Sequence, residues 1–176
     1  METVYTLRNR EITALPQEII FYNDGKKVQY TIYRNGKKNG EYRSWYANGN
    51  PEVETSYVDD KRDGEYKWWY ENGQLRARLT YKNGKKNGEY KTWYENGKIK
   101  SVNTCIDDKI DNIAIQYFKS GNVRSVSTYK HGELNGCCLM LFPLGNTFRQ
   151  SIYENDKLIS TITYNETGNV VFDSSL

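Results

Sequence analysis

The stretch NGKKNGEYRSWYANG, from Asn35 to Gly49, is followed by close copies of itself at a spacing of 24 residues. DDKRDGEYKWWYENG runs from Asp59 to Gly73, and NGKKNGEYKTWYENG runs from Asn83 to Gly97. A fixed period of this length is typical of repeat proteins, in which each unit buries apolar surface against its neighbours. The period therefore determines the fold class before any other feature of the chain is considered.

The period extends over residues 16–159, where six units of 24 residues fit without a gap. The units start at Pro16, Gly40, Gly64, Gly88, Asn112 and Gly136. We expect residues 1–15 to form an N-terminal segment or cap. We expect residues 160–176 to form a partial repeat and C-terminal cap, in which Gly168 stands one residue out of phase.

Two turn signals divide each unit into two strands. One is the pair Asn72-Gly73 and its equivalents, and the other is the pair Asn83-Gly84 and its equivalents. Asn-Gly favours a type I′ turn, in which both central residues have positive φ. The segments between the turns are rich in Tyr, Trp, Val, Ile and Thr and show no helical period. The sequence thus predicts an all-β protein, an elongated single-layer antiparallel meander of repeated β-hairpins.

The two faces of this sheet differ in chemistry. If Asn72-Gly73 is a two-residue loop, Tyr70 lies opposite Leu75, and Trp69 lies opposite Arg76. One face is then an aromatic and aliphatic ladder, which in this unit contains Tyr66, Tyr70, Leu75, Ala77, Leu79 and Tyr81. The other face is charged and carries one tryptophan in each of three successive units. The same alternation groups Tyr94 with Ile99, and it places Trp93 opposite Lys100.

Composition narrows the functional classes. The chain has 25 Lys+Arg and 22 Asp+Glu, so its net charge of +3 argues against a nucleic-acid-binding protein. Its 16 tyrosines and four tryptophans indicate a folded chain rather than a disordered one. The three cysteines give neither a disulfide framework nor a zinc motif. The N-terminal sequence lacks the apolar core of a signal peptide, so we expect a cytoplasmic or other intracellular location.

No motif points to catalysis, a cofactor or a metal. His131 is the only histidine, and it occupies a turn position where other units have asparagine. Cys137 and Cys138 are neighbours in a strand and point to opposite faces. The acidic pair Asp59-Asp60 is followed by basic residues and lacks calcium-loop spacing. We therefore predict a non-enzymatic protein without cofactor or metal.

Two sets of residues are candidate binding groups. Basic residues recur at one phase of the repeat, in the turns, where they would suit anionic lipid headgroups. They are Lys37, Lys38, Lys61, Arg62, Lys85 and Lys86. The tryptophans Trp45, Trp69 and Trp93 could form a stacking platform for a partner. The alternatives are structural: solvated turns that discourage aggregation, and cation–π pairs within each hairpin.

The stretch GCCLMLFPLG, from Gly136 to Gly145, suggests a third site. Cys137, Leu139 and Leu141 stand where earlier units have Glu, Lys and Trp, so both faces of this strand are apolar. Such a strand favours association with another chain, and we hypothesise a homodimer through the C-terminal units. Alternatively, residues 160–176 fold back and cover it.

The motif of an aromatic residue, two further residues and glycine, followed by Tyr-x-x-Gly-x-x-x-Gly, resembles the MORN-variant repeat. NGEYKTWYENGKIKS and YKNGKKNG carry the likeness, which covers about residues 16–159. The chain departs from the pattern after residue 105: Cys105 replaces a tyrosine, Asn112 replaces a glycine, and the unit from Gly136 lacks the tryptophan.

The resemblance implies an interaction or scaffolding module that binds another protein. Some members of the family are described as antitoxins of bacterial toxin–antitoxin pairs, and others occur in giant DNA viruses, so one alternative is an antitoxin that binds a cognate toxin. A second alternative is peripheral binding to anionic membranes through the basic turns.

Overall fold

The computed structural model describes residues 3–6, 17–23 and 26–174, which form two units, residues 1–86 and 87–176. Most of the predicted N-terminal segment lies outside the described residues. Its described part, β1 (Thr3–Thr6), pairs with β2 (Gln17–Asn23). The described residues contain no helix, so none of them could span a membrane as one.

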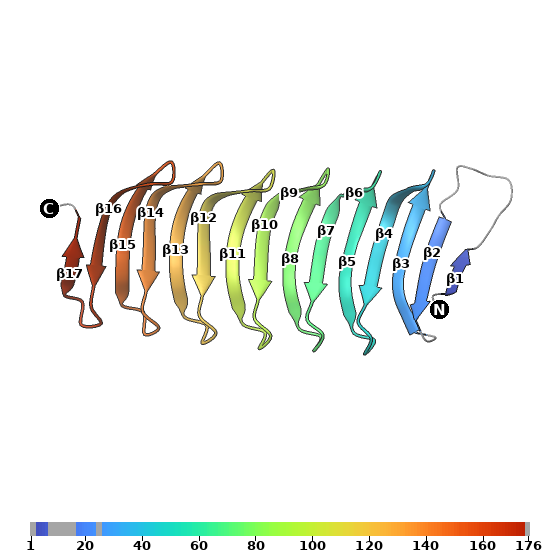
Figure 1. Cartoon of the computed structure of the whole chain (residues 1–176), viewed down its shortest axis with the longest axis horizontal. Coiled ribbons are helices and arrows are strands. Elements are labelled where there is room, and N and C mark those ends of the chain that lie inside the picture. The colour runs from blue at the N-terminus through green and yellow to red at the C-terminus, as the bar shows by residue number, and fades with distance from the viewer. Residues whose placement is uncertain (1–2, 7–16, 24–25, 175–176) are drawn as a thin grey trace. The chain divides into compact units, whose positions relative to one another are not determined.

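Unit 1 is an antiparallel meander in which the strands follow one another in chain order (Figure 1). After β1 and β2 come β3 (Lys26–Arg34), β4 (Lys37–Trp45) and β5 (Pro51–Val58). The short β6 (Lys61–Arg62) and β7 (Gly64–Trp69) both pair with β5. β8 (Leu75–Lys82) pairs with β7 and with β9 (Lys85–Lys86).

Unit 2 repeats this plan. Its strands are β10 (Gly88–Trp93), β11 (Ile99–Ile106), β12 (Lys109–Tyr117), β13 (Val123–Lys130), β14 (Glu133–Leu141), β15 (Thr147–Glu154), β16 (Lys157–Tyr164) and β17 (Val170–Asp173). Each unit is a single antiparallel layer. The predicted all-β meander of repeated hairpins is therefore confirmed.

The turns are of two kinds, and only one of them is the predicted type I′. At Asn83-Gly84 φ is 52° and 84°, and the flanking residues pair directly, as a two-residue type I′ hairpin requires. His131 occupies such a turn with φ 55°, which agrees with its reading as a turn residue. At the other site only Gly73 has positive φ, at 84°, and the Gly73 amide donates to the Tyr70 carbonyl.

The turn at Asn72-Gly73 is therefore a type I turn followed by a left-handed glycine, which makes a three-residue loop. The type I′ prediction at this site is wrong, although the positive φ predicted at Gly49, Gly73 and Gly97 is confirmed. The longer loop adds a bulge, so that Trp69 pairs with Leu75 and Trp68 pairs with Ala77. Arg76 is the unpaired extra residue.

A second bulge lies in the hairpin that each type I′ turn closes, and it explains why most units start with glycine. Between β13 and β14, Ser127 pairs with Cys138, whereas Tyr129 pairs with Leu134, so β14 holds two extra residues. Gly136 adopts φ 104° there, and Asn112 takes the same role at φ 66°. Between β15 and β16 the shift is a single residue, which accounts for the phase of Gly168.

The core lies on one face of each sheet, here called the tyrosine face. All residues that are buried in the described part of the chain belong to it by strand alternation: Thr31, Ser44, Thr55, Ala77, Leu79, Cys105, Ala114 and Ser151. Tyrosines flank these mostly small side chains, as in the edge-to-face pair of Tyr66 and Tyr81, whose centroids are 5.7 Å apart. The other side of the sheet is called the opposite face.

The bulges correct two face assignments. Leu75 and Ile99 pair with Trp69 and Trp93 on the opposite face, not with the tyrosines. Arg76 crosses to the tyrosine face, where its guanidinium carbon lies 3.6 Å from the centroid of Trp68. Likewise, Lys100 Nζ lies 5.9 Å from the centroid of Tyr94. The predicted cross-strand pairs of Trp69 with Arg76 and of Trp93 with Lys100 are therefore wrong.

Hydrogen bonds link each hairpin to the next along the chain. The Tyr46 hydroxyl donates to the Trp69 carbonyl at 2.7 Å, and the Tyr94 hydroxyl donates to the Tyr117 carbonyl at 2.7 Å. At the type I′ end, the Gly84 amide donates to the Arg62 carbonyl at 2.7 Å. Such nearest-neighbour bonds satisfy turn groups that would otherwise need water.

Candidate interaction surfaces

The opposite face of unit 1 is charged. Arg43 pairs with Glu54, Glu54 pairs with Lys67, and Lys67 pairs with Arg78, which gives a row of charges across four strands. Glu65 lies beside this row and accepts from Lys67 at 2.8 Å and from Arg78 at 2.6 Å. Such a face is well solvated, and its charges compensate one another.

In unit 2 the same row begins with Lys91 of β10 and is apolar from β11 onward. Val102 pairs with Ile115, Ile115 pairs with Val126, and Val126 pairs with Leu139. The row continues through Gln150 to Ile162. Together with its neighbours it forms the unit 2 apolar face, defined as Val102, Ile113, Ile115, Val126, Cys137, Leu139, Leu141, Ile152 and Ile162.

This face is open to solvent. Ile113 is 53% exposed and Ile152 is 38% exposed, and none of the nine residues is buried. Between β11 and β16 the strand interiors on this side hold only aliphatic, hydroxyl, thiol, amide and tyrosine side chains. Charges return towards the type I′ turns, at Asp111, Lys130 and Glu154. A contiguous exposed apolar patch of this kind is unusual for a surface that stays in water.

The C-terminal residues predicted to associate lie in this face. Cys137 pairs with Ile152, Leu139 with Gln150, and Leu141 with Thr147. Cys138 points to the tyrosine face, where its Sγ lies 3.1 Å from Ser127 Oγ. The alternative that residues 160–176 fold back is wrong for their described part, because β16 and β17 extend the sheet and leave the face uncovered.

The basic turns divide into two sets. Lys37, Lys61 and Lys85 are exposed. In contrast, Lys38 Nζ lies 5.1 Å from the centroid of Tyr57, and the Arg62 guanidinium carbon lies 5.1 Å from that of Tyr66. Lys86 pairs with Tyr81. Lys38 and Arg62 therefore pack on tyrosines, which leaves a thinner basic stripe than the sequence indicated.

Arg62 shows how closely this second set is held by its surroundings. Burial lowers its pKa, but the hydroxyls of Tyr57, Tyr81 and Tyr66 outweigh that effect and raise it above its ordinary value. The guanidinium therefore stays charged at every physiological pH.

The three tryptophans lie on the opposite face and are half-buried. Trp45 pairs with Pro51, Trp69 with Leu75, and Trp93 with Ile99, each beside the three-residue loop. Each tryptophan thus lies opposite an apolar residue of the neighbouring strand. This placement supports a structural role for the rings.

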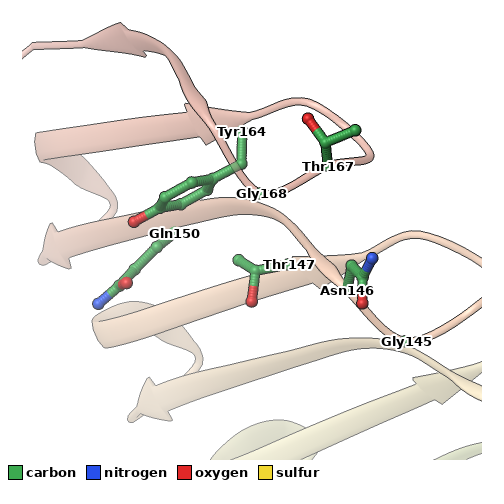
Figure 2. A pocket seen from close by; sticks show the side chains of 7 residues that line it. All are labelled: Gly145, Asn146, Thr147, Gln150, Tyr164, Thr167 and Gly168. Carbon is green, nitrogen blue, oxygen red and sulfur yellow. The ribbon is translucent and has the colours of Figure 1, made fainter.

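A hollow of about 560 Å³ adjoins the unit 2 apolar face at the loops that follow β14 and β16 (Figure 2). It is lined by Gly145, Asn146, Thr147, Gln150, Tyr164, Thr167 and Gly168. These residues offer hydroxyl, amide and backbone groups but neither a charge nor a base. The described residues also contain no cluster of three or more His, Cys, Asp or Glu that could hold a metal ion.

Hairpins repeated every 24 residues, with both kinds of turn in register, define a β-hairpin repeat protein. The protein-family model described as MORN repeat variant matches residues 38–59, 62–83, 86–104 and 110–131. The chain is therefore a MORN-variant repeat protein. A search of curated proteins finds no match. MORN repeats are commonly interaction or membrane-binding modules and are in general not catalytic.

Sequence reasoning found the apolar residues of β14 but missed those of the neighbouring strands. The signal was present: NIAIQ, from Asn112 to Gln116, replaces the GEYKW of Gly64 to Trp68. Comparing the units column by column would have placed Ile113 and Ile115 in the positions of Glu65 and Lys67.

Proposed function

We propose that this protein is a non-enzymatic interaction module and that a partner protein docks on the unit 2 apolar face. The observation that carries the proposal is the row from Val102 to Leu139, which replaces the charged row of unit 1 and is only half-buried. Removing contiguous apolar surface from water lowers the free energy by about 25 cal/mol per Å². Surfaces of this kind mark sites of protein association.

The test compares two matched variants. Val126→Lys introduces a charge into the apolar face, and Glu54→Lys changes the residue in the same column of unit 1. Affinity capture with each immobilised protein, read by mass spectrometry, should show partners that Glu54→Lys retains and Val126→Lys loses. Equal capture by both variants would place the contact elsewhere and refute the proposal.

A cognate toxin is one partner that the family likeness suggests. In that case the protein is an antitoxin, and the apolar face is the surface that neutralises the toxin. Co-expression with the neighbouring gene product should relieve growth arrest, and Val126→Lys with Leu139→Lys should abolish the relief. Arrest that both forms relieve equally would exclude this face as the neutralising surface.

Binding to anionic membranes is a second candidate function, supported by the exposure of Lys37, Lys61 and Lys85. Each basic residue near an anionic surface contributes about 1 kcal/mol. Sedimentation with phosphatidylserine vesicles should fall steeply with salt, and it should disappear when these three lysines become glutamine. Wild-type protein that stays in the supernatant at low salt excludes this function.

A further inference from the structure

We infer that the occupant of the unit 2 apolar face is the same face of a second copy of this chain, related by a two-fold axis. The inference rests on the proposed function and deepens it by naming the partner. It starts from the chemistry of the face, which carries no charge between β11 and β16 except near the type I′ turns.

In a two-fold contact a surface packs against the same surface of a second copy. The charges on that surface therefore decide whether the contact is favourable. The row Ile115, Val126 and Leu139 places no charge opposite a like charge. The corresponding row of unit 1 holds Arg43, Lys67 and Arg78 with a single glutamate, Glu54, between them. Docking that row on itself would desolvate cations beside cations, which is costly. The two-fold contact therefore fits unit 2 and not unit 1.

The geometry of a single-layer sheet suits this arrangement. Two sheets that pack face to face lie about 10 Å apart, and their side chains interdigitate. A two-fold axis that runs along the strands between β13 and β14 sets Val126 above Leu139 of the second copy. The same axis sets Val102 above Ile162 of the second copy. Each residue of the row except Ile115, which faces Gln150 of the second copy, then meets an aliphatic side chain.

The edges of the face provide a polar rim. Lys130 pairs with Glu133, and Glu154 pairs with Lys157, where the strands meet the type I′ turns. At the β10 side, Lys91 Nζ lies 2.8 Å from Glu89 Oε1. An apolar centre inside a polar rim is the usual anatomy of a protein interface.

The size of the face sets the strength of the dimer. Six strands at about 4.8 Å and five residues at about 3.3 Å give a footprint of roughly 480 Å² per copy. That area lies below the roughly 800 Å² per partner of a standard interface, in the range of transient complexes. We therefore expect a dissociation constant of micromolar order, so that the population of dimer depends on concentration.

Sedimentation velocity of the full chain over about 1 to 300 μM tests the inference. The wild type should move from monomer to dimer across this range. Val126→Lys with Leu139→Lys should weaken dimerisation at least 100-fold, whereas Glu54→Lys should leave it unchanged. Circular dichroism and thermal melting show whether each variant is folded.

Cysteine cross-linking gives a second test that needs no charged variant. The axis brings Cys137 of the two copies within reach of a short bismaleimide, while Cys138 lies on the tyrosine face. Cross-linked dimer should form in Cys138→Ser and be lost in Cys137→Ser. A protein that remains monomeric at 300 μM, or cross-linking that survives Cys137→Ser, overturns the inference. If the monomer still captures partners that Val126→Lys loses, the proposed function stands and only the two-fold contact fails.

Discussion

Unit 1 and unit 2 share a backbone plan and differ in what one face presents. Both contain type I′ turns, three-residue loops and mid-hairpin bulges with positive φ. On the opposite face, however, Arg43, Glu54 and Lys67 in unit 1 become Ile115, Val126 and Leu139 in unit 2. The difference teaches that the turns, bulges and tyrosine face specify the fold, while the opposite face is free to acquire a function.

The tyrosine face changes in the same direction. In unit 1, Lys38 and Arg62 pack over tyrosine rings, whereas the equivalent residues of unit 2 are Ile110, Leu134 and Leu158. Cation–π contacts thus give way to aliphatic ones as the chain proceeds. Unit 2 is more apolar than unit 1 on both faces.

The largest expected effect comes from transferring the apolar row to unit 1. The combined change Arg43→Val, Glu54→Val, Lys67→Leu and Arg78→Val gives unit 1 the residue types of unit 2. A chain with two apolar faces should form species larger than a dimer, because each copy can then bind two others. Multi-angle light scattering at fixed concentration measures this. A mass no greater than that of the wild type would show that side-chain chemistry alone does not make the surface adhesive.

The next effect concerns the bulge glycines, which share a backbone conformation in the two units. Gly64 has φ 108°, and a Cβ built on it would lie 2.6 Å from Ser56 Oγ. Gly88 has φ 98° and no atom within 4 Å of its Cβ position. Gly64→Ala should cost about 2–3 kcal/mol of unfolding free energy and Gly88→Ala about 1 kcal/mol, since only the first adds a clash to the strain.

Urea denaturation measures both changes. Adding Ser56→Ala to Gly64→Ala removes the clash and should bring the cost of the alanine close to that of Gly88→Ala. Equal costs at the two glycines would mean that backbone strain is the whole effect.

A smaller effect separates the two units at the arginines that follow the three-residue loops. The Arg76 guanidinium carbon lies 3.6 Å from the Trp68 centroid, and that of Arg124 lies 6.0 Å from the Phe118 centroid. Arg76→Ala should lower the unfolding free energy by about 1 kcal/mol and Arg124→Ala by about 0.5 kcal/mol or less. Arg76→Lys, which keeps the charge but loses planar stacking, should fall between them; a larger loss at Arg124 would contradict the geometric argument.

The smallest effect is one of pH. The hydrogen bond from Lys67 lowers the pKa of Glu65; burial opposes it, and Arg78 adds to the lowering. Because the folded pKa lies below the unfolded one, Glu65 contributes stability above the unfolded pKa, and this contribution is lost as pH falls through the folded pKa. Glu65→Gln should therefore cost at most about 0.5 kcal/mol at pH 7 and less at about pH 3.

The equivalent residue in unit 2 is Ile113, whose side chain has no titratable group. The cost of Ile113→Thr should be the same at both pH values. Melting curves at pH 7 and pH 3 make the comparison, and a Glu65→Gln effect that is independent of pH would show that the ion pair is not its source.

The repeat, its turn positions and its tyrosine face could be predicted because each rests on local residue choice. The loop type at Asn72-Gly73 could not, because Asn-Gly suits a type I′ turn and also a type I turn whose glycine is left-handed. The two differ by one loop residue, and that residue decides whether Arg76 faces Trp69 or Trp68. The sequence pattern alone does not reveal such a one-residue shift.

The candidate site was predictable only in part for the same reason. Leu139 could be identified within its own strand, since it replaces a charged residue. Its neighbours in the row, Val126 and Ile115, belong to other strands. They join it through a register set by the loop bulge between β12 and β13 and by the two-residue bulge between β13 and β14. A surface built across strands becomes visible once that register is known.

The bulge in the middle of each hairpin pair has a consequence for how the length of such a chain can change. Between Asp60 and Gly73, and again between Gly84 and Gly97, 13 positions separate the two turns. Removal of 24 residues would rejoin equivalent positions. Every later side chain would keep its own side of the sheet, and each tyrosine hydroxyl that bonds the next hairpin would again meet a backbone carbonyl. Removal of 23 would reverse the faces, unless a bulge absorbed the missing residue as the last one does before Gly168. The number of repeats in such a chain can therefore change in steps of 24 residues without altering which side chains lie on each face of the sheet.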